Sequence, residues 1–217
     1  MVEVVIATRN RHKFRELTTL LRLPGIRWRS LADVPRVSIG EETGRTFDAN
    51  AITKARAAAR ATGCVALADD SGVEVDALGG APGIRSARFS GRHGDDAANN
   101  AKLLRLLRGV RGGRRRARYQ CALALAGPSR FVAITQGTWA GRIAERPAGR
   151  GGFGYDPIFF IPSRGKTVGQ LPHRLKQRLS HRAAAARRMR PILRRFITDG
   201  VTRAIPAGDR RDLVRAA

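Results

Sequence analysis

The sequence predicts an α/β fold built on a mixed β-sheet, and three observations support this prediction. Short apolar runs rich in β-branched residues alternate with amphipathic stretches at helical spacing, as in other α/β proteins. Residues 118–126 and 131–139 are extended segments separated by a short Gly-Pro-Ser turn, which predicts paired neighbouring strands. Hydrophobic residues make up 42% of the 217 residues, which is ordinary for a globular protein and too high for a disordered chain.

The N-terminal half of the chain predicts strands and helices in alternation. Its predicted elements are a buried strand at 2–7, a helix at 12–22, a loop at 35–44, an Ala-rich helix at 46–61, a buried strand at 65–68 and a further strand at 73–78. The Asp-Asp-Ser-Gly segment at 69–72 is expected to end the strand before it, because these residue types favour a turn.

The C-terminal half continues this mixture of strands and helices. Its predicted elements are a helix at 95–107, strands at 118–126, 131–139 and 158–161, and a helix at 175–188. Pro191 is expected to end or kink the last helix, because proline has no N–H to donate. The chain is polar, basic and interrupted by Gly and Pro from Thr198, so we expect one domain over 1–197 and a loose tail over 198–217.

The composition argues against a membrane protein and against a disulfide-rich secreted one. No apolar stretch approaches the ~20 residues that a transmembrane helix needs, and the N-terminus lacks the pattern of a signal peptide. Two cysteines, Cys64 and Cys121, are too few for a disulfide framework or a zinc site. Both lie in apolar runs, so we expect buried free thiols and a cytoplasmic protein.

The formal net charge of +25 predicts attraction to polyanions such as nucleic acid, anionic lipid or phosphorylated small molecules. Only five of the 42 basic residues are lysines, and the basic residues are spread along the chain. Aromatic residues make up 6% of the chain and do not alternate with the basic ones as a base-stacking surface would require. The sequence therefore favours non-specific nucleic-acid association at low salt over specific recognition.

Two segments carry residues suited to phosphate and metal chemistry. Thr8, Asn10 and Lys13 stand between a predicted strand and a predicted helix, whose N-terminal N–H groups would suit phosphate. Helix capping beside a solvated lysine explains the same residues. Asp69 and Asp70 follow a buried strand, where a carboxylate could bind Mg²⁺ or take a proton from an attacking water. A simple Asp-Asp-Ser-Gly turn is the alternative.

Three further groups of polar residues have a functional and a structural interpretation. Asn50 and Lys54 are four residues apart on one predicted helix face, which equally fits a capped surface helix. The glycines at 151–154 would let a flat ligand approach the Phe153 ring, or would simply form a tight turn. On one predicted helix Lys176, Ser180 and His181 would form a donor cluster or a solvated basic face.

Taken together, six ordered segments resemble one family, the inosine triphosphate pyrophosphatase or Ham1-like family, whose bacterial members are called dITP/XTP pyrophosphatases. The segments are Thr-x-Asn-x-x-Lys, Glu-Glu-Thr-Gly-x-Thr-Phe-x-x-Asn-Ala-x-x-Lys-Ala, Ala-Asp-Asp-Ser-Gly, Gly-Gly-Ala-Pro-Gly-Ile-x-Ser-Ala-Arg, Gly-Gly-Phe-Gly-Tyr-Asp-Pro-Ile-Phe and Ser-His-Arg. The resemblance runs from about Val2 to Leu193.

The resemblance implies an elongated mixed sheet with two lobes around a central cleft, and a homodimer. It implies Mg²⁺-dependent hydrolysis of ITP, dITP and XTP to the monophosphate and pyrophosphate, which cleanses the nucleotide pool. The implied metal ligands are Glu41 and Asp70, with Asp70 also the proton acceptor. The implied substrate-binding residues are Thr8, Arg9, Asn10, Arg11, His12, Lys13, Lys54, Ser71, Phe153, Gly154, Tyr155, Asp156, Lys176, His181 and Arg182.

The chemistry of these residues is consistent with that role. Donors from Lys176, His181 or Arg182 would meet the 6-oxo group of hypoxanthine or xanthine, whereas the 6-amino group of adenine would oppose them. The family has Glu where this chain has Gln170, a change that leaves the implied metal ligands in place. Two alternatives remain, a basic nucleic-acid-binding protein on the same scaffold and a pyrophosphatase for a different modified nucleotide.

Overall fold

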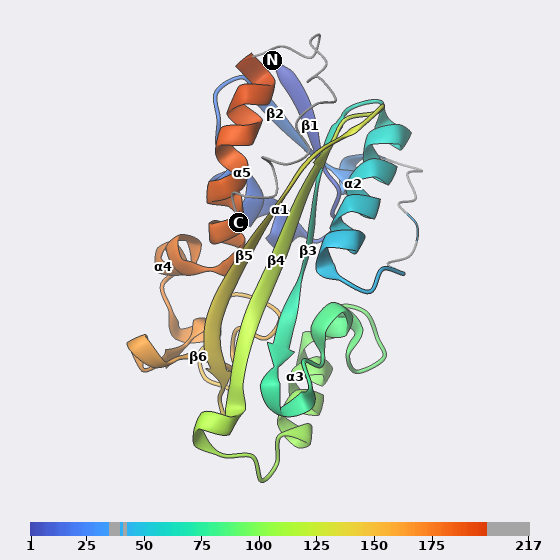
Figure 1. The fold of residues 1–217 in the computed structure, drawn as a ribbon. Coiled ribbons are helices and arrows are strands. Elements are labelled where there is room, and N and C mark those ends of the chain that lie inside the picture. Colours follow the sequence, from blue (N-terminus) through green and yellow to red (C-terminus); the bar gives the residue numbers. More distant parts are fainter. Residues whose placement is uncertain (35–39, 41–42, 199–217) are drawn as a thin grey trace, which may run out of the picture. The chain divides into compact units, whose positions relative to one another are not determined.

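A seven-stranded β-sheet runs through the part of the chain that the structure, a computed structural model, describes, namely residues 1–34, 40 and 43–198 (Figure 1). Its strands are β1 (Val2–Ile6), β2 (Ile26–Ser30), β3 (Val65–Val75), β4 (Arg116–Ala126), β5 (Phe131–Ile143), β6 (Phe159–Ile161) and β7 (Lys166–Thr167), in the order β2-β1-β3-β4-β5-β6-β7. β1 pairs in parallel with β2 and β3, whereas β6 pairs antiparallel with β5 and β7. The predicted mixed α/β sheet is confirmed.

The helices are α1 (Arg11–Leu20), α2 (Phe47–Thr62), α3 (Asp96–Leu106), α4 (His173–Leu179) and α5 (His181–Thr198). The chain divides into two compact units. Unit 1 comprises Met1–Asp70, Ala122–Gln136 and Ala184–Ala217, and unit 2 comprises Ser71–Cys121 and Gly137–Ala183. The cleft that the resemblance implies between two lobes stays a prediction, and most of the predicted tail, 199–217, lies outside the described residues.

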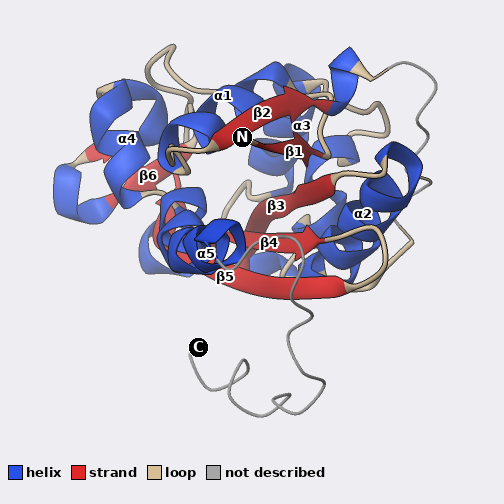
Figure 2. Cartoon of the chain, turned by 90° about the horizontal axis from the view of Figure 1, so that it is seen from above, coloured by secondary structure: helices blue, strands red, loops and turns tan. Residues whose placement is uncertain are grey.

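Unit 1 is built on small residues along one face of its strands. Buried alanines of α2, at 51, 55, 58 and 59, pack against Val5 and Ala7 of the β1 segment and against alanines of β3 and β4. α2 covers this face of the strands and α5 lies on the opposite one (Figures 1 and 2). Alanine side chains are short, so α2 can lie close to β3. The longer polar side chains of α2, Asn50 and Lys54, therefore reach this strand.

β3 differs from the prediction, because it continues without a break through residues 69–72. The turn propensity of Asp-Asp-Ser-Gly is overridden by tertiary contacts, since Asp69 pairs with Lys13 and Asp70 pairs with Lys54. A Cβ on Gly72 would lie 2.3 Å from Ser86 Oγ, so glycine is required by close approach at this position. The prediction that these residues end the strand was wrong.

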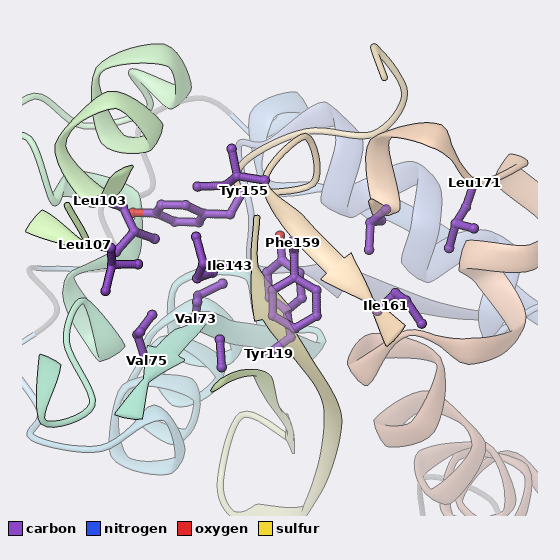
Figure 3. Close-up of a cluster of buried hydrophobic side chains, with 13 residues drawn as sticks. Val73, Val75, Leu103, Leu107, Tyr119, Ile143, Tyr155, Phe159, Ile161 and Leu171 are labelled. Carbon is purple, nitrogen blue, oxygen red and sulfur yellow. The ribbon is translucent and has the colours of Figure 1, made fainter. Parts of the chain in front are cut away.

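Unit 2 has a larger-residue core, shown in Figure 3. Its buried residues are Val73, Val75, Leu103, Leu107, Ala117, Tyr119, Ile143, Tyr155, Ile158, Phe159, Ile161, Val168 and Leu171. The leucine spacing of the predicted helix at 95–107 puts Leu103, Leu104, Leu106 and Leu107 on its apolar side. Leu103, Leu104 and Leu107 pack into this core, whereas Leu106 is 46% exposed.

Two other elements differ from the prediction. β2 was not predicted, although Ile26 and Trp28 alternate with Arg27 and Arg29 as in a strand with one exposed face. The predicted helix 175–188 is two helices, because the backbone of Ser180 is extended between α4 and α5. Pro191 does not end α5, which continues to Thr198.

Some compositional predictions are also tested by the structure. Within the described ranges, no helix is both long and apolar enough to span a bilayer. Cys121 is a buried free thiol, as predicted, whereas Cys64 is free but only half-buried. Burial and the neighbouring Glu3 raise the pKa of the Cys64 thiol.

One member of the dense basic run at 111–118 is a structural residue. Arg115 is 5% exposed, and its guanidinium donates to the backbone oxygens of Leu107, Val110, Ile143 and Ala144 at 2.7–3.0 Å. Burial lowers the pKa of the Arg115 guanidinium. Arg115 therefore ties the end of α3 to the end of β5 within unit 2.

We expect Arg115→Met to lower the free energy of unfolding by about 3 kcal/mol, because it leaves buried carbonyl oxygens without their donor. The matched control is Arg114→Met, since Arg114 is exposed in the same turn and its loss should change stability by less than about 0.5 kcal/mol. Urea denaturation followed by circular dichroism measures both. Equal effects of the two substitutions would contradict the structural role of Arg115.

Candidate active site

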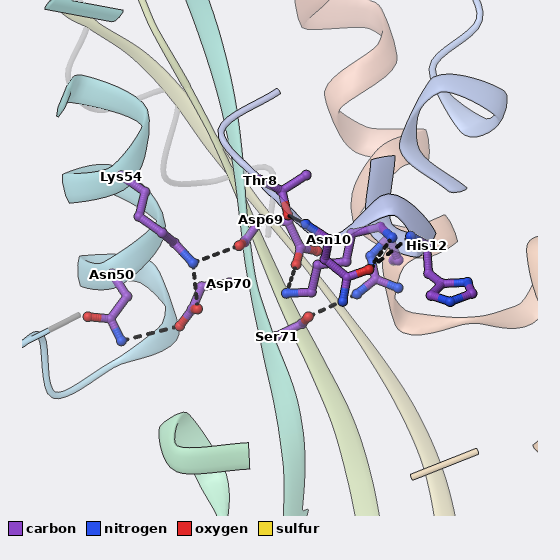
Figure 4. A network of polar contacts seen from close by, with 10 residues as sticks. Thr8, Asn10, His12, Asn50, Lys54, Asp69, Asp70 and Ser71 are labelled. Carbon is purple, nitrogen blue, oxygen red and sulfur yellow. Dashed lines mark hydrogen bonds and ion pairs between the residues drawn. The ribbon is translucent and has the colours of Figure 1, made fainter. Parts of the chain in front are cut away.

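The segment between β1 and α1 is held by its own polar side chains. Asn10 caps α1, because its side-chain oxygen accepts the backbone N–H groups of His12 and Lys13 at 2.9 and 3.1 Å. Thr8 Oγ1 accepts the N–H of Asn10 at 3.1 Å (Figure 4). The capping interpretation is thus confirmed for Asn10, whereas Thr8 holds Asn10 and does not itself cap the helix.

Lys13 is not a solvated residue of this segment. Its ammonium forms an ion pair with Asp69 Oδ1 at 2.5 Å, and the Asp69 side chain is fully buried. The other predicted residues of this segment, Arg9, Arg11 and His12, are exposed. The structure thus places exposed basic residues at the start of α1, directly before a half-buried lysine that is paired with a buried carboxylate.

Asp70 is bound from α2 by the two residues that the helical spacing placed together. Lys54 Nζ donates to Asp70 Oδ1 and to the Asp69 carbonyl oxygen, both at 2.8 Å, and Asn50 Nδ2 lies 3.3 Å from Asp70 Oδ2. Asn50 and Lys54 are 1% and 7% exposed, which excludes the alternative of a solvated helix face. Figure 4 shows that Asp69 and Asp70 project to opposite sides of β3.

These carboxylates fit a divalent cation in part. Asp70 offers one carboxylate on its side of β3, and Mg²⁺ takes one or two carboxylates together with substrate phosphates. No group of three or more His, Cys, Asp or Glu side chains that could hold a metal occurs among the described residues. The second implied ligand, Glu41, lies outside the described residues.

In unit 2, the turn at 153–156 is organised around the buried carboxylate of Asp156. Asp156 Oδ2 accepts the Phe153 N–H at 2.9 Å and the Lys176 ammonium at 2.6 Å. Asp156 Oδ1 accepts the hydroxyl of Tyr119 at 3.0 Å. Asp156 is only 2% exposed. Because its carboxylate binds a backbone N–H of the turn and side chains from other elements, it fixes the shape of the turn.

α3 holds the same turn from another side. Asp96 Oδ2 accepts the Gly154 N–H at 2.6 Å, and Asn100 Nδ2 donates to the Gly154 carbonyl oxygen at 3.0 Å. Asp96 and Asn100 are four residues apart and thus lie on one face of α3. Together they bind the backbone N–H and the backbone carbonyl oxygen of Gly154. Burial and the charge of Asp96 raise the pKa of Tyr155, whose hydroxyl donates to the Ser86 carbonyl oxygen.

Cations surround the ring of Phe153. Lys176 Nζ lies 4.4 Å from the ring centroid, and the guanidinium carbon of Arg182 lies 5.7 Å from it. Arg182 is 2% exposed and donates to Ser71 Oγ at 2.9 Å. Phe153 itself is half-buried, so an aromatic ring beside two cations is partly accessible in unit 2.

The structure groups the predicted residues differently from the sequence in one respect. Lys176 is on α4 and His181 is the first residue of α5, so they do not share a helix face. Ser180 separates the two helices, and its hydroxyl accepts the N–H of Ala183. The prediction that Lys176, Ser180 and His181 lie on one helix was wrong.

Sequence reasoning did not single out Tyr119, Asp96 and Asn100. Tyr119 lies in an apolar strand and reads as a core residue, and Asp96 and Asn100 read as an ordinary helix start. Their roles depend on tertiary contacts with the 153–156 turn, about which local spacing carries no signal.

Comparison with known proteins identifies related chains along most of this one. The model of the Ham1 family matches residues 4–192. A dITP/XTP pyrophosphatase of Geobacillus kaustophilus is 51% identical over 185 residues, covering 85% of this chain and 91% of the relative. One of Escherichia coli O157:H7 is 48% identical over 196 residues, covering 89% and 99%. The solved structure of a HAM1 protein from Coxiella burnetii has a TM-score of 0.82 at 40% identity, covering 90% of this chain and all of that one.

Proposed function

Because this chain belongs to the Ham1 family, we propose that it is a nucleoside triphosphate pyrophosphatase that converts ITP, dITP and XTP to the monophosphate and pyrophosphate. The observation that carries this proposal is the buried carboxylate of Asp70, which Lys54 and Asn50 of α2 hold in one position. A fixed carboxylate beside an ammonium group supplies a proton acceptor and a positive charge for hydrolysis of a phosphoanhydride.

Unit 1 supplies the groups for the triphosphate. The capped N-terminus of α1 and the exposed cations Arg9 and Arg11 favour negative charge, and Lys13 and Lys54 add ammonium groups near the two carboxylates. In the reaction these cations bind the phosphates and reduce the repulsion that an attacking water meets. Thr8 and Asn10 keep the segment in place through the contacts described above.

Asp70 is the residue that orients or deprotonates the attacking water. Its carboxylate is held in one position by Lys54 and Asn50, so its geometry is fixed before substrate binds. Mg²⁺ would be held by Asp70 and Glu41 together with the substrate phosphates, and would supply charge neutralisation at the phosphates.

Unit 2 supplies the groups for the purine. Phe153 offers a ring face for stacking, and Lys176, His181 and Arg182 offer donors for a 6-oxo group. The 6-amino group of adenine would leave donors opposed, at a cost of about 1–3 kcal/mol or roughly ten- to a hundredfold in discrimination. We further propose a homodimer and a cytoplasmic location, which the sequence resemblance implies.

Pyrophosphate release from ITP, dITP, XTP, ATP and GTP in the presence of Mg²⁺ tests this proposal. We expect release from the three deaminated nucleotides at least tenfold faster than from ATP, and loss of release when EDTA removes the metal. Release of orthophosphate in place of pyrophosphate, or none from any of these nucleotides, would contradict the proposal. If a different modified nucleotide were preferred, the reaction would still be that of a pyrophosphatase, but the proposed substrates would be wrong.

A second candidate function, nucleic-acid association, is favoured by the surface of α5. The exposed arginines of this helix are Arg187, Arg188, Arg190, Arg194 and Arg195. The helix carries no acidic residue, and the one acidic residue of α1, Glu16, is 7% exposed. Such a face would bind a phosphate backbone without reading bases, since it presents charge and no exposed aromatic ring.

We expect the triple substitution Arg187→Gln, Arg190→Gln and Arg194→Gln to weaken binding to a single-stranded DNA oligonucleotide. If each arginine contacts one phosphate, the slope of log affinity against log salt should fall by about 2. The control removes three exposed arginines from unit 2, at positions 105, 108 and 114. Fluorescence anisotropy from 50 to 200 mM salt measures the slopes, and equal losses in both variants would attribute binding to net charge alone.

A further inference from the structure

Tyr119 connects two parts of unit 2 that the proposed function assigns to the purine. We propose that Tyr119 is a positioning residue for base recognition, which fixes the carboxylate of Asp156 through its hydroxyl and the imidazole of His181 through its ring. This inference rests on the proposed function, because it concerns how that same site distinguishes one base from another.

The contacts of Tyr119 are made in the core of unit 2. Tyr119 lies on β4 and is 7% exposed. Its ring is stacked on that of His181, with centroids 4.5 Å apart and an interplanar angle of 8°, and it packs against Phe159 at 4.3 Å. Stacked rings resist tilting, so this contact sets the plane of the imidazole.

The plane of the His181 ring determines where its hydrogen bonds point, because each ring nitrogen donates or accepts within that plane. His181 is the first residue of α5, directly after the extended Ser180, so its backbone belongs to a helix end. His181 is 4% exposed. Its backbone is held by the start of α5 and its ring by the stack on Tyr119, so the direction of the imidazole is defined. Hydrogen bonds to a carbonyl oxygen of a base depend steeply on such direction.

The hydroxyl of Tyr119 acts through Asp156. It donates to Oδ1, which holds the carboxylate so that Oδ2 meets the Phe153 N–H and the Lys176 ammonium. The stacking ring and the cation beside it are thus both placed by one carboxylate. Loss of the Tyr119 hydroxyl would let this carboxylate rotate, and Phe153 and Lys176 would no longer be fixed.

The protonation state of Tyr119 supports this role. Burial, together with the nearby charge of Asp156, raises the pKa of the Tyr119 hydroxyl well above its ordinary value. The hydroxyl therefore remains a donor throughout the neutral pH range. A phenylalanine at this position would keep the ring and lose only the donor, which separates the two contacts experimentally.

Steady-state kinetics of Tyr119→Phe and Tyr119→Leu with ITP and ATP test the proposal. We expect Tyr119→Phe to raise KM for ITP about tenfold with kcat within about twofold, because a hydrogen bond to a charged group that orients the binding turn is lost. Tyr119→Leu should lower the ratio of kcat/KM for ITP over ATP further, because it also removes the stack on His181. The imidazole proton signals of His181 should shift in Tyr119→Leu and not in Tyr119→Phe.

The matched control is Ile143→Val, a mild change in the same core cluster. Melting temperatures of all variants separate stability from recognition, and Ile143→Val should leave KM and the ITP-to-ATP ratio unchanged. If Tyr119→Phe and Ile143→Val behave alike while the wild type hydrolyses ITP, Tyr119 is a core residue only and the inference is overturned. If the wild type releases no pyrophosphate from any nucleotide, the proposed function fails and this inference fails with it.

Discussion

Substitution of Asp70 by asparagine is expected to lower kcat/KM for ITP by about 10²–10⁴-fold, the usual contribution of a positioned general base. Asparagine has the size of aspartate, so Asn50 and Lys54 still find a polar partner of similar shape. The change removes the carboxylate that would take the proton and bind the cation. Pyrophosphate release measured at saturating and subsaturating ITP separates the effect on kcat from that on KM.

The stability of this variant must be measured beside its activity. Asp70 and Lys54 have side chains 7% and 8% exposed, and breaking a buried ion pair costs about 3–5 kcal/mol. The control is Asp48→Asn, which also removes one negative charge, but from the exposed start of α2. There Asp48 accepts a hydrogen bond from the exposed side chain of Gln136. Full activity of Asp70→Asn in a folded sample would rule out Asp70 as the proton acceptor.

Much of unit 1 could be predicted because its signals are local. Asn50 and Lys54 were predicted to share one helix face, and in the structure both contact the same carboxylate. The segment 69–72 could not be predicted in this way. Its residue types favour a turn, whereas partners from α1 and α2, distant in the chain, bind it in the extended conformation.

The errors in unit 2 have the same physical origin. A helix over 175–188 satisfies the periodicity, but the sequence does not show the extended backbone at Ser180 that separates α4 from α5. The roles of Tyr119 and of the two α3 residues at the 153–156 turn follow from packing between segments that are 37–58 residues apart. Periodicity describes one segment at a time, so it cannot show these contacts.

Most lysines of this chain lie beside buried aspartates. The chain has five lysines among 42 basic residues. Two of them, Lys13 and Lys54, pair with aspartates on β3, and Lys176 pairs with the aspartate of the 153–156 turn. The three ammonium groups lie 2.5–2.8 Å from the aspartate oxygens that they contact. An ammonium is a compact point charge on a flexible stem, whereas a guanidinium is a planar fork of donors.

Asp156→Asn is expected to lower the stability of the protein strongly. It would leave the Lys176 ammonium without its buried counter-charge, since the two side chains are 3% and 6% exposed. The expected loss is about 3–5 kcal/mol, or roughly 6–20 °C in melting temperature for a chain of this size. Thermal unfolding measures it. The control Asp76→Asn breaks a half-exposed pair with Arg118 and should cost less than about 1 kcal/mol.

A double substitution distinguishes loss of the ion pair from loss of the carboxylate as a hydrogen-bond acceptor. Asp156→Asn combined with Lys176→Met removes both charges, so it should recover a large part of the stability that Asp156→Asn loses. Binding of ITP should not recover, because the Phe153 N–H and the cation beside the ring are no longer placed by the carboxylate. Recovery of binding together with stability would show that Asp156 serves only to neutralise Lys176, and the turn would then owe its shape to the Asp96 and Asn100 contacts of α3.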